Sequence, residues 1–241
     1  MVGSIVRLLL DFFLCFLEIG RMLFYKMRPM KKYLFLIFVL ALGSGLAAQK
    51  QLSDVFEKGD VVWFGLDFSQ AKFVQILNEQ GSETEIVEKW IPAWNNLMVS
   101  EPGKYDFAKT FKKEQVVYAI ETAARINDQI APEGLLVSSC PDLEAPEALV
   151  ADLIKAYDTG SVTEGLGLVF VVTCFNKGTV QGSMYLTFFD IASREVLLCE
   201  KMTGRAAGFG IRNYWAGSIY DVLKQVQKKD FKRWRSKYLS K

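Results

Sequence analysis

The sequence predicts an α+β fold: a mixed sheet with helices packed on it, ending in a three-stranded antiparallel meander that one helix closes. Two observations carry this prediction. Three apolar, β-rich runs joined by short turn-forming breaks lie between Gly165 and Thr203. After Gly204 the apolar residues recur at three- and four-residue spacing, which indicates a helix with one buried stripe. A hydrophobic share of 51% over 241 residues is sufficient for one core.

The amino-terminal part carries the layout of a secretory signal. Residues 30–48 read MKKYLFLIFVLALGSGLAA, in which Lys31 and Lys32 precede the apolar run Tyr33–Leu42 and small residues follow. A short basic region, an apolar helix and a small-residue peptidase site are the three parts of such a signal. We expect cleavage after Ala47. A retained membrane anchor is the alternative, although the run is shorter than the roughly 20 residues of a full span. No cysteine follows the run, which argues against a lipid-modified amino terminus.

Residues 1–29 precede what would already be a complete signal. We interpret them as an over-extended reading frame, with an amphipathic membrane-surface helix as the alternative. Residues 1–47 hold six of the 29 basic and two of the 27 acidic residues, so residues 48–241 carry 23 basic and 25 acidic groups. This slightly acidic balance argues against a nucleic-acid partner.

The first half of residues 48–241 is expected to contain a strand and two helices. The apolar run Asp60–Phe68 indicates a buried strand that leads into a loop or helix at Ser69–Lys72. An apolar stripe over residues 86–97 predicts a helix that Pro92 kinks. A second helix is expected over roughly Lys112–Ile130.

The second half follows the same logic, and we expect residues 48–241 to form a single domain. Asn176–Thr179 is typical of a hairpin turn, because Asn and Gly tolerate positive φ angles. The remaining predicted elements are a strand at residues 135–139, a helix at 148–157, strands at 166–175, 183–190 and 195–203, and the closing helix at 211–226.

The residue inventory excludes several chemistries. The chain has no histidine, which rules out Ser–His–Asp and Cys–His catalytic systems and imidazole metal sites. Cys140, Cys174 and Cys199 lack the paired spacing of a zinc or redox site, and we expect them to be buried free thiols. No motif selects a pair of carboxylates for hydrolysis. The sequence therefore predicts no metal and no cofactor, and it favours a role other than catalysis.

Two places could bind a small ligand. The glycine-rich segment Gly204–Arg212 joins a strand to a helix and carries Arg205 and Arg212, a combination that can hold a phosphate or carboxylate. Asp67 and Ser69 follow the first strand, where α/β domains often place functional groups. For Gly204–Arg212 the alternative is a flexible crossover that needs glycine backbone conformations. For Asp67 and Ser69 it is an ordinary structural role in a turn.

The carboxyl-terminal segment, Lys228–Lys241, interleaves aromatic and basic residues. Such a pattern is found in interfacial membrane helices and in contacts with acidic partners, whereas the alternative is a solvated helix end. The predicted interaction surface consists of Phe231, Arg233, Trp234, Arg235 and Tyr238.

The run YLTFFDIASREVL at Tyr185–Leu197, followed by Thr203–Gly204 and the closing helix, carries a family resemblance. It resembles the envelope domain shared by the curli-secretion channel subunit, the amino-terminal domain of the Tol–Pal periplasmic propeller protein, and lipoprotein activators of peptidoglycan synthases. Those proteins have a strand ending in Asp, a turn and Glu-Val-Leu. The chain lacks their acylated cysteine and inserts two helices between Asp67 and Leu135, so the resemblance implies only the fold and the compartment.

A second resemblance concerns the first half of the domain. The runs Asp60–Phe73 and Trp94–Lys113 resemble an exported protein family of Bacteroidetes-type bacteria without an assigned activity. Together these patterns predict an exported, non-catalytic protein of the periplasm or outer membrane that binds envelope proteins or itself. Peripheral membrane contact through the carboxyl-terminal tail fits the same pattern. The alternative is a periplasmic domain that binds, or hydrolyses, a small anion or other small ligand at Gly204–Arg212.

Overall fold

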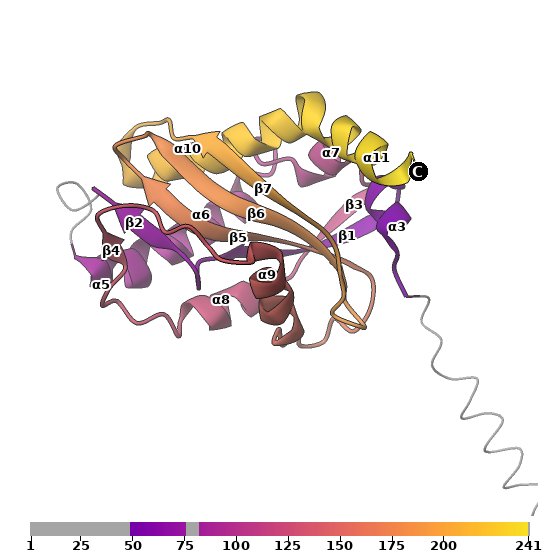
Figure 1. Cartoon of the computed structure of the whole chain (residues 1–241), viewed down its shortest axis with the longest axis horizontal. Coiled ribbons are helices and arrows are strands. Elements are labelled where there is room, and N and C mark those ends of the chain that lie inside the picture. Colours follow the sequence, from indigo (N-terminus) through magenta and orange to yellow (C-terminus); the bar gives the residue numbers. More distant parts are fainter. Residues whose placement is uncertain (1–48, 76–81, 241) are drawn as a thin grey trace, which may run out of the picture. The chain divides into compact units, whose positions relative to one another are not determined.

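The structure is a computed structural model that describes residues 49–75 and 82–240 (Figure 1). The predicted start segment, 1–29, and the predicted signal peptide, 30–47, lie outside the described residues. The chain divides into two units after Ala47, and every described residue belongs to the second, Ala48–Lys241.

The described part of the chain alternates helices with strands. The amino-terminal half contains α3 (Leu52–Phe56), β1 (Asp60–Asp67), β2 (Lys72–Val74), α5 (Glu83–Glu85), the π-helical turn η1 (Ile86–Trp90), α6 (Ile91–Ser100), α7 (Phe107–Phe111), β3 (Gln115–Tyr118), α8 (Glu121–Asn127) and β4 (Leu136–Val137). The carboxyl-terminal half contains α9 (Pro146–Lys155), β5 (Leu166–Asn176), β6 (Gln181–Asp190), β7 (Val196–Arg205), α10 (Gly210–Gln225), the π-helical turn η2 (Val226–Asp230) and α11 (Phe231–Leu239).

All seven strands form one mixed sheet around β5. β1 and β2 both pair in parallel with the same edge of β5. β3 pairs in parallel with the outer edge of β1, and β4 with the outer edge of β2. Along its other edge, β5 pairs antiparallel with β6, which pairs antiparallel with β7 (Figure 1). The α+β mixed sheet is thus confirmed. The antiparallel expectation holds only in part, because β1 to β4 are joined by parallel pairs.

Each face of the sheet carries its own apolar core. Alternation along the strands sends neighbouring side chains to opposite faces: Trp63 lies in the larger core with residues of α6, α7, α10 and α11, whereas Phe64 lies in the smaller core with Val150 and Ile154 of α9. Both cores and the whole sheet lie within Ala48–Lys241, so this unit has what a domain needs to fold by itself.

The expected helix over residues 112–130 was wrong in its first half. Gln115–Tyr118 forms β3, paired in parallel with β1, and only Glu121–Asn127 is helical. The adjacent β-branched Val116 and Val117 fit an extended edge strand better than a helix. A turn at residues 69–70 follows Asp67 and leads into the short strand β2. In the helical region around Pro92, a π-helical turn lies just before that proline.

Candidate functional site

The carboxyl end of β1 is built around a bulge held by two buried asparagines. The register with β5 shifts between Trp63 and Leu66, and Gly65 adopts a φ of +106°. Asn95 of α6 accepts a hydrogen bond from the Leu66 N–H at 2.7 Å and donates one to its carbonyl at 3.0 Å. Asn127 of α8 donates to the same carbonyl at 2.9 Å. These bonds satisfy the backbone that the bulge leaves unpaired.

Asp67, one of the predicted ligand residues, is fully buried at this point. One carboxylate oxygen accepts a 2.5 Å hydrogen bond from the Tyr157 hydroxyl, and the other accepts one from the Ser69 N–H at 2.8 Å. Burial, and then the nearby charge of Asp67, raises the pKa of Tyr157 well above its usual value. Asp67 therefore fastens the chain after α9 to the sheet, and its two oxygens are both engaged.

Ser69 lies in a different setting, at the rim of a surface pocket of about 380 Å³. The pocket lies between the turn after β1 and the chain that follows α8, and its lining includes Lys72, Gln129 and Glu133. The Lys72 ammonium donates a 2.7 Å hydrogen bond to the Gly134 carbonyl. Asp67 does not line this pocket, so the two predicted residues touch through the Ser69 N–H but do not share a ligand site.

The Gly204–Arg212 crossover is closely packed against α10. A Cβ at Gly204 would overlap the carbonyl oxygen of Ser218, and one at Gly217 would overlap that of Ala207. The side chains of Arg205 and Arg212 are both exposed, and the Arg205 N–H donates to Asp221 at 2.9 Å. The glycines therefore allow a strand and a helix to touch backbone to backbone, whereas the two arginine side chains lie in solvent.

The same crossover presents an apolar side chain to solvent. Phe209 is 95% exposed, the highest value among the exposed large hydrophobic residues of the described chain. Its carbonyl accepts a 3.2 Å hydrogen bond from the Asn213 side chain, and the glycines on either side have φ angles of +136° and +72°. The exposed ring was not among the predicted site residues, which in this segment were the two arginines. An aromatic residue between two glycines is the sequence feature that could have indicated it.

The predicted carboxyl-terminal surface divides into a buried and an exposed half. Phe231 and Trp234 are 2% and 0% exposed and belong to the larger core. Tyr238 is half-buried and donates a 2.9 Å hydrogen bond to Glu200 of β7. Arg233 and Arg235 are exposed. The aromatic residues thus attach the helix to the larger core and to β7, and of the five predicted residues only Arg233 and Arg235 remain for an outside contact.

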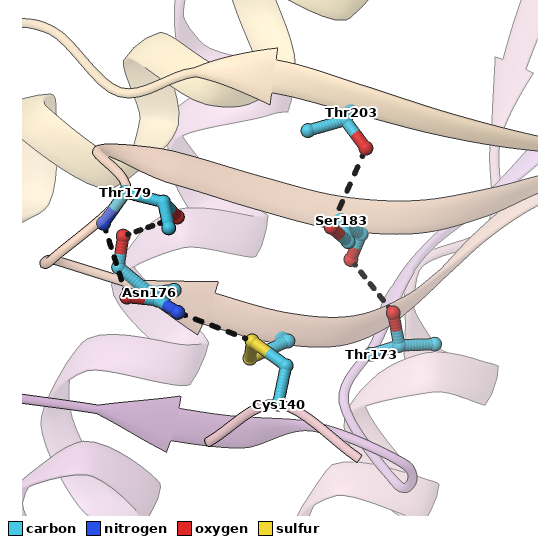
Figure 2. The surroundings of a disulfide bond; sticks show 7 residues. Cys140, Thr173, Asn176, Thr179, Ser183 and Thr203 are labelled. Atoms are coloured by element: carbon cyan, nitrogen blue, oxygen red, sulfur yellow. Dashed lines mark hydrogen bonds between the residues drawn. A yellow bond between two sulfur atoms is a disulfide. The ribbon is translucent and has the colours of Figure 1, made fainter. Parts of the chain in front are cut away.

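The expectation of three free thiols was wrong for two of them. Cys140, in the loop after β4, forms a disulfide with Cys174 of β5 (Figure 2). Asn176, at the start of the β5–β6 hairpin, lies beside this bond with its side-chain amide 3.6 Å from the Cys140 sulfur. The pairing depends on the path of a loop that crosses β5, and spacing alone does not show it. Cys199 is free, and burial raises its pKa to about 11, so its thiol stays protonated and unreactive at neutral pH.

Asp190, at the centre of the motif that carries the family resemblance, closes the turn between β6 and β7. It accepts hydrogen bonds from the N–H and hydroxyl of Ser193, at 2.8 and 2.7 Å, and from the N–H of Lys50 at 2.9 Å. Burial alone would raise its pKa, but these hydrogen bonds outweigh burial and lower it. The motif is therefore a turn that also binds the incoming chain.

The outer edge of β7 is covered at its end but open in its middle. The Thr203 carbonyl and the Arg205 N–H are bound by Gln225 and Asp221 of α10, both at 2.9 Å. Because outward-facing backbone groups alternate along a strand, those of Lys201 also face outward. Among the described residues no strand pairs with this edge of β7.

Lys113 is a buried residue whose pKa is lowered, as in many active sites, but whose hydrogen-bond partners are backbone carbonyls. Its ammonium donates to the carbonyls of Asp54 and Glu57, at 2.6 and 2.8 Å, and so caps the carboxyl end of α3. Burial lowers its pKa from 10.5 to about 8, against the attraction of Asp54. The side chain is 8% exposed, and no carboxylate lies in an ion pair with it among the described residues.

This shift predicts a pH dependence of stability. Between pH 8 and pH 10.5 the unfolded state binds the Lys113 proton and the folded state has released it, so the free energy of unfolding rises with pH. We expect the wild type to gain about 2 to 3 kcal/mol across this window relative to Lys113→Met, which cannot titrate. Urea unfolding at several pH values measures the difference, in which tyrosine contributions cancel. Parallel pH profiles for the two proteins would show that Lys113 keeps an ordinary pKa.

The described residues contain no group of three or more Cys, Asp or Glu side chains placed to hold a metal ion. Within residues 49–75 and 82–240, no helix has the length and apolar character to cross a membrane. Comparison with protein-family models, with curated proteins and with solved structures found no match.

Proposed function

We propose that this chain is an exported, non-catalytic protein of the cell envelope that works by binding another protein. The observation that carries the proposal is Phe209, an aromatic side chain that is 95% exposed on a turn held in place by Asn213. A buried aromatic ring contributes some 150–250 Å² of contact area, and such residues are the usual anchors of protein interfaces. A partner pocket that accepts Phe209 would remove this ring from water.

The neighbouring edge of β7 supports the same proposal. The edge is open at Lys201, and the stretch Thr203–Arg205, which α10 covers, separates it from Phe209. An extended segment of a partner could therefore pair with β7 at Lys201 as a second contact beside the one at the ring. In this arrangement main-chain hydrogen bonds supply affinity and the aromatic anchor supplies specificity. The two features lie along one continuous stretch of chain, Val196–Phe209.

Two further features support the envelope assignment. The Cys140–Cys174 disulfide is of a kind that persists in oxidising compartments outside the cytosol. The order β5–β6–β7–α10, with Asp190 closing the turn, agrees with the envelope domain that the sequence resembles, and we propose that domain as the fold. The predicted signal peptide gives the same compartment.

A pull-down from envelope fractions tests the role of Phe209. The wild-type domain and Val117→Ser are expected to capture the same partner, whereas Phe209→Ser is expected to lose it, because the anchor is gone while the fold is unchanged. Val117 is the matched control, since it is also an exposed apolar residue but lies on β3 and is 41% exposed. Equal capture by all three proteins, or reproducible capture by none, would contradict the proposal.

A small-ligand role is the second candidate, and one observation favours it. The pocket of about 380 Å³ beside Ser69 combines a hydroxyl, an ammonium and a carboxylate at its lining. It does not include Arg205 or Arg212, so the ligand site would differ from the predicted crossover. If the pull-down captures nothing, this pocket becomes the leading candidate for the function.

A further inference from the structure

The carboxyl-terminal helix presents a strongly basic face. Backbone helical geometry continues through η2, so α10, η2 and α11 form one helix from Gly210 to Leu239. Residues 210–239 contain eight Lys and Arg and two Asp. Of the two acids, Asp230 is buried and Asp221 is bonded to the Arg205 N–H and to Gln225. The exposed side of this helix is therefore almost purely cationic.

Most of these cations lack an acidic partner within the described chain. Arg233 pairs with Asp230 at 3.2 Å and Lys237 with Glu200 at 2.9 Å. The cations without an ion pair to another described residue are Arg212, Lys224, Lys228, Lys229, Lys232 and Arg235. Of these, Lys224, Lys228, Lys232 and Arg235 recur at three- and four-residue spacing, so they form a row on one side of the helix. Such a row is an electrostatic binding surface for an anionic partner.

A different segment of the domain has the reverse charge. Residues 119–165, which carry α8, β4 and α9, contain nine acidic and two basic residues. α9 packs on the smaller core and α10 on the larger, so α9 lies over the face of the sheet opposite to α10, whereas Leu135 of the acidic segment belongs to the larger core. The nearly neutral total charge therefore conceals a local excess of positive charge on the helix Gly210–Leu239.

A notch in the basic face has the dimensions of a small headgroup. Between α7 and α10 lies a cavity of about 130 Å³, lined by Lys104, Lys109 and Lys224 together with Tyr220 and Asp106. The Lys224 and Lys104 ammonium groups lie 4.7 and 5.8 Å from the centre of the Tyr220 ring. Lys104 also pairs with Glu101 at 3.7 Å, and the Asp106 carboxylate is already bonded to the Lys109 N–H. The three lysines outnumber the two carboxylates, so the notch has a net positive charge, which favours an anion such as a phosphate ester.

The place where the chain enters the domain favours a membrane over a soluble anion. The first described residue, Gln49, leads directly into α3, and α3 lies beside α11 (Figure 1). The Phe56 and Phe231 rings of these two helices are 5.4 Å apart. The apolar run Tyr33–Leu42 precedes Gln49 in the sequence. Whether this run is cleaved after export or kept as an anchor, it indicates delivery of the domain to a membrane, where an anionic lipid surface is the partner at hand.

We propose that the basic face of Gly210–Leu239, with the Lys104–Lys109–Lys224 notch, binds the phosphate headgroups of an anionic membrane surface. This surface is distinct from Phe209 and from the open edge of β7, and it needs no membrane-spanning helix. The buried aromatic residues of α11 fix the helix to the larger core, so the face is held in place on the domain. In binding of this kind each lysine or arginine near the surface adds to the affinity, and the affinity falls as the salt concentration rises.

Vesicle co-sedimentation tests the proposal with the domain Ala48–Lys241. Vesicles that contain phosphatidylglycerol are expected to bind the domain in a salt-dependent manner, and vesicles of phosphatidylcholine alone are not. The triple variant Lys104→Gln, Lys109→Gln, Lys224→Gln is expected to bind roughly tenfold or more weakly, since each lysine near an anionic surface contributes appreciably.

The matched control is Lys155→Gln, Lys177→Gln, Lys201→Gln, which removes the same charge from other parts of the molecule and is expected to bind as the wild type does. Circular dichroism and the urea midpoint establish that each variant is folded. Equal binding to neutral vesicles, or equal loss in both triple variants, would overturn the assignment. So would competition by soluble glycerol phosphate or polyglutamate that matches the vesicles, because the partner would then be a soluble anion.

Discussion

Truncation of Trp234 to alanine is expected to lower the free energy of unfolding by about 3 to 5 kcal/mol. The indole is fully buried in the larger core, which also contains Phe231, so it anchors α11 to that core. Its ring nitrogen has no hydrogen-bond partner among the described residues, so the loss comes from packing and the cavity left behind. Urea unfolding of the domain measures the change.

Arg235→Ala is the control for this prediction, because the neighbouring side chain is exposed and its removal should change stability by no more than about 0.5 kcal/mol. Near-equal stabilities of Trp234→Ala and the wild type would show that α11 does not pack on the sheet. In that case the aromatic residues would again be candidates for an interaction surface.

Removal of the Cys140–Cys174 disulfide is expected to cost about 4 kcal/mol. The two cysteines are separated by 34 residues, and a cross-link over a loop of that length restricts the unfolded chain by about this amount in the chain-entropy treatment. The bond also attaches the loop after β4 to the central strand β5. Beside it lies the hydrogen bond between the Asn176 amide and the Cys140 sulfur. Thermal and urea unfolding of Cys140→Ser/Cys174→Ala against the oxidised wild type measure the loss.

The reducing agent supplies an internal control. Dithiothreitol is expected to destabilise the wild type towards the level of the double variant and to leave the double variant unchanged. Cys199→Ser is expected to respond to the reductant as the wild type does, since Cys199 is free. A wild type whose unfolding is insensitive to reductant would mean that the bond is absent in solution.

The carboxyl-terminal half of the fold was predictable because its signals are local. Strands β5, β6 and β7 and helix α10 lie within a few residues of the predicted ranges. Each strand is a long β-rich apolar run bounded by turn residues, and the helix has apolar residues at three- and four-residue spacing. The segment around Val116 was not predictable, because its apolar residues fit either period. Its strand character comes from pairing with β1, some 55 residues earlier in the chain.

The candidate sites show the same limit more strongly. Asp67 and Ser69 are two residues apart, yet one lies in the core and the other lines a pocket, because β1 ends at Asp67 and Ser69 lies in the turn that follows. The mixture of Phe231, Trp234 and arginines was visible, but which face of the helix meets the sheet depends on the hydrophobic core. The total charge concealed the basic helix Gly210–Leu239, because acidic residues elsewhere in the chain balance its eight cations in the sum.

The position of β5 determines when the sheet can be completed during synthesis. β1 and β2 lie end to end along one edge of β5, and before β5 is made they can pair only with the short strands β3 and β4. Isolated two-strand pairs are marginally stable, and such long-range pairing is slow. Residues 48–165 would therefore leave the ribosome without a stable sheet, and folding would wait for the last third of the chain. A chain that remains unfolded until late is also one that a translocation machinery can thread.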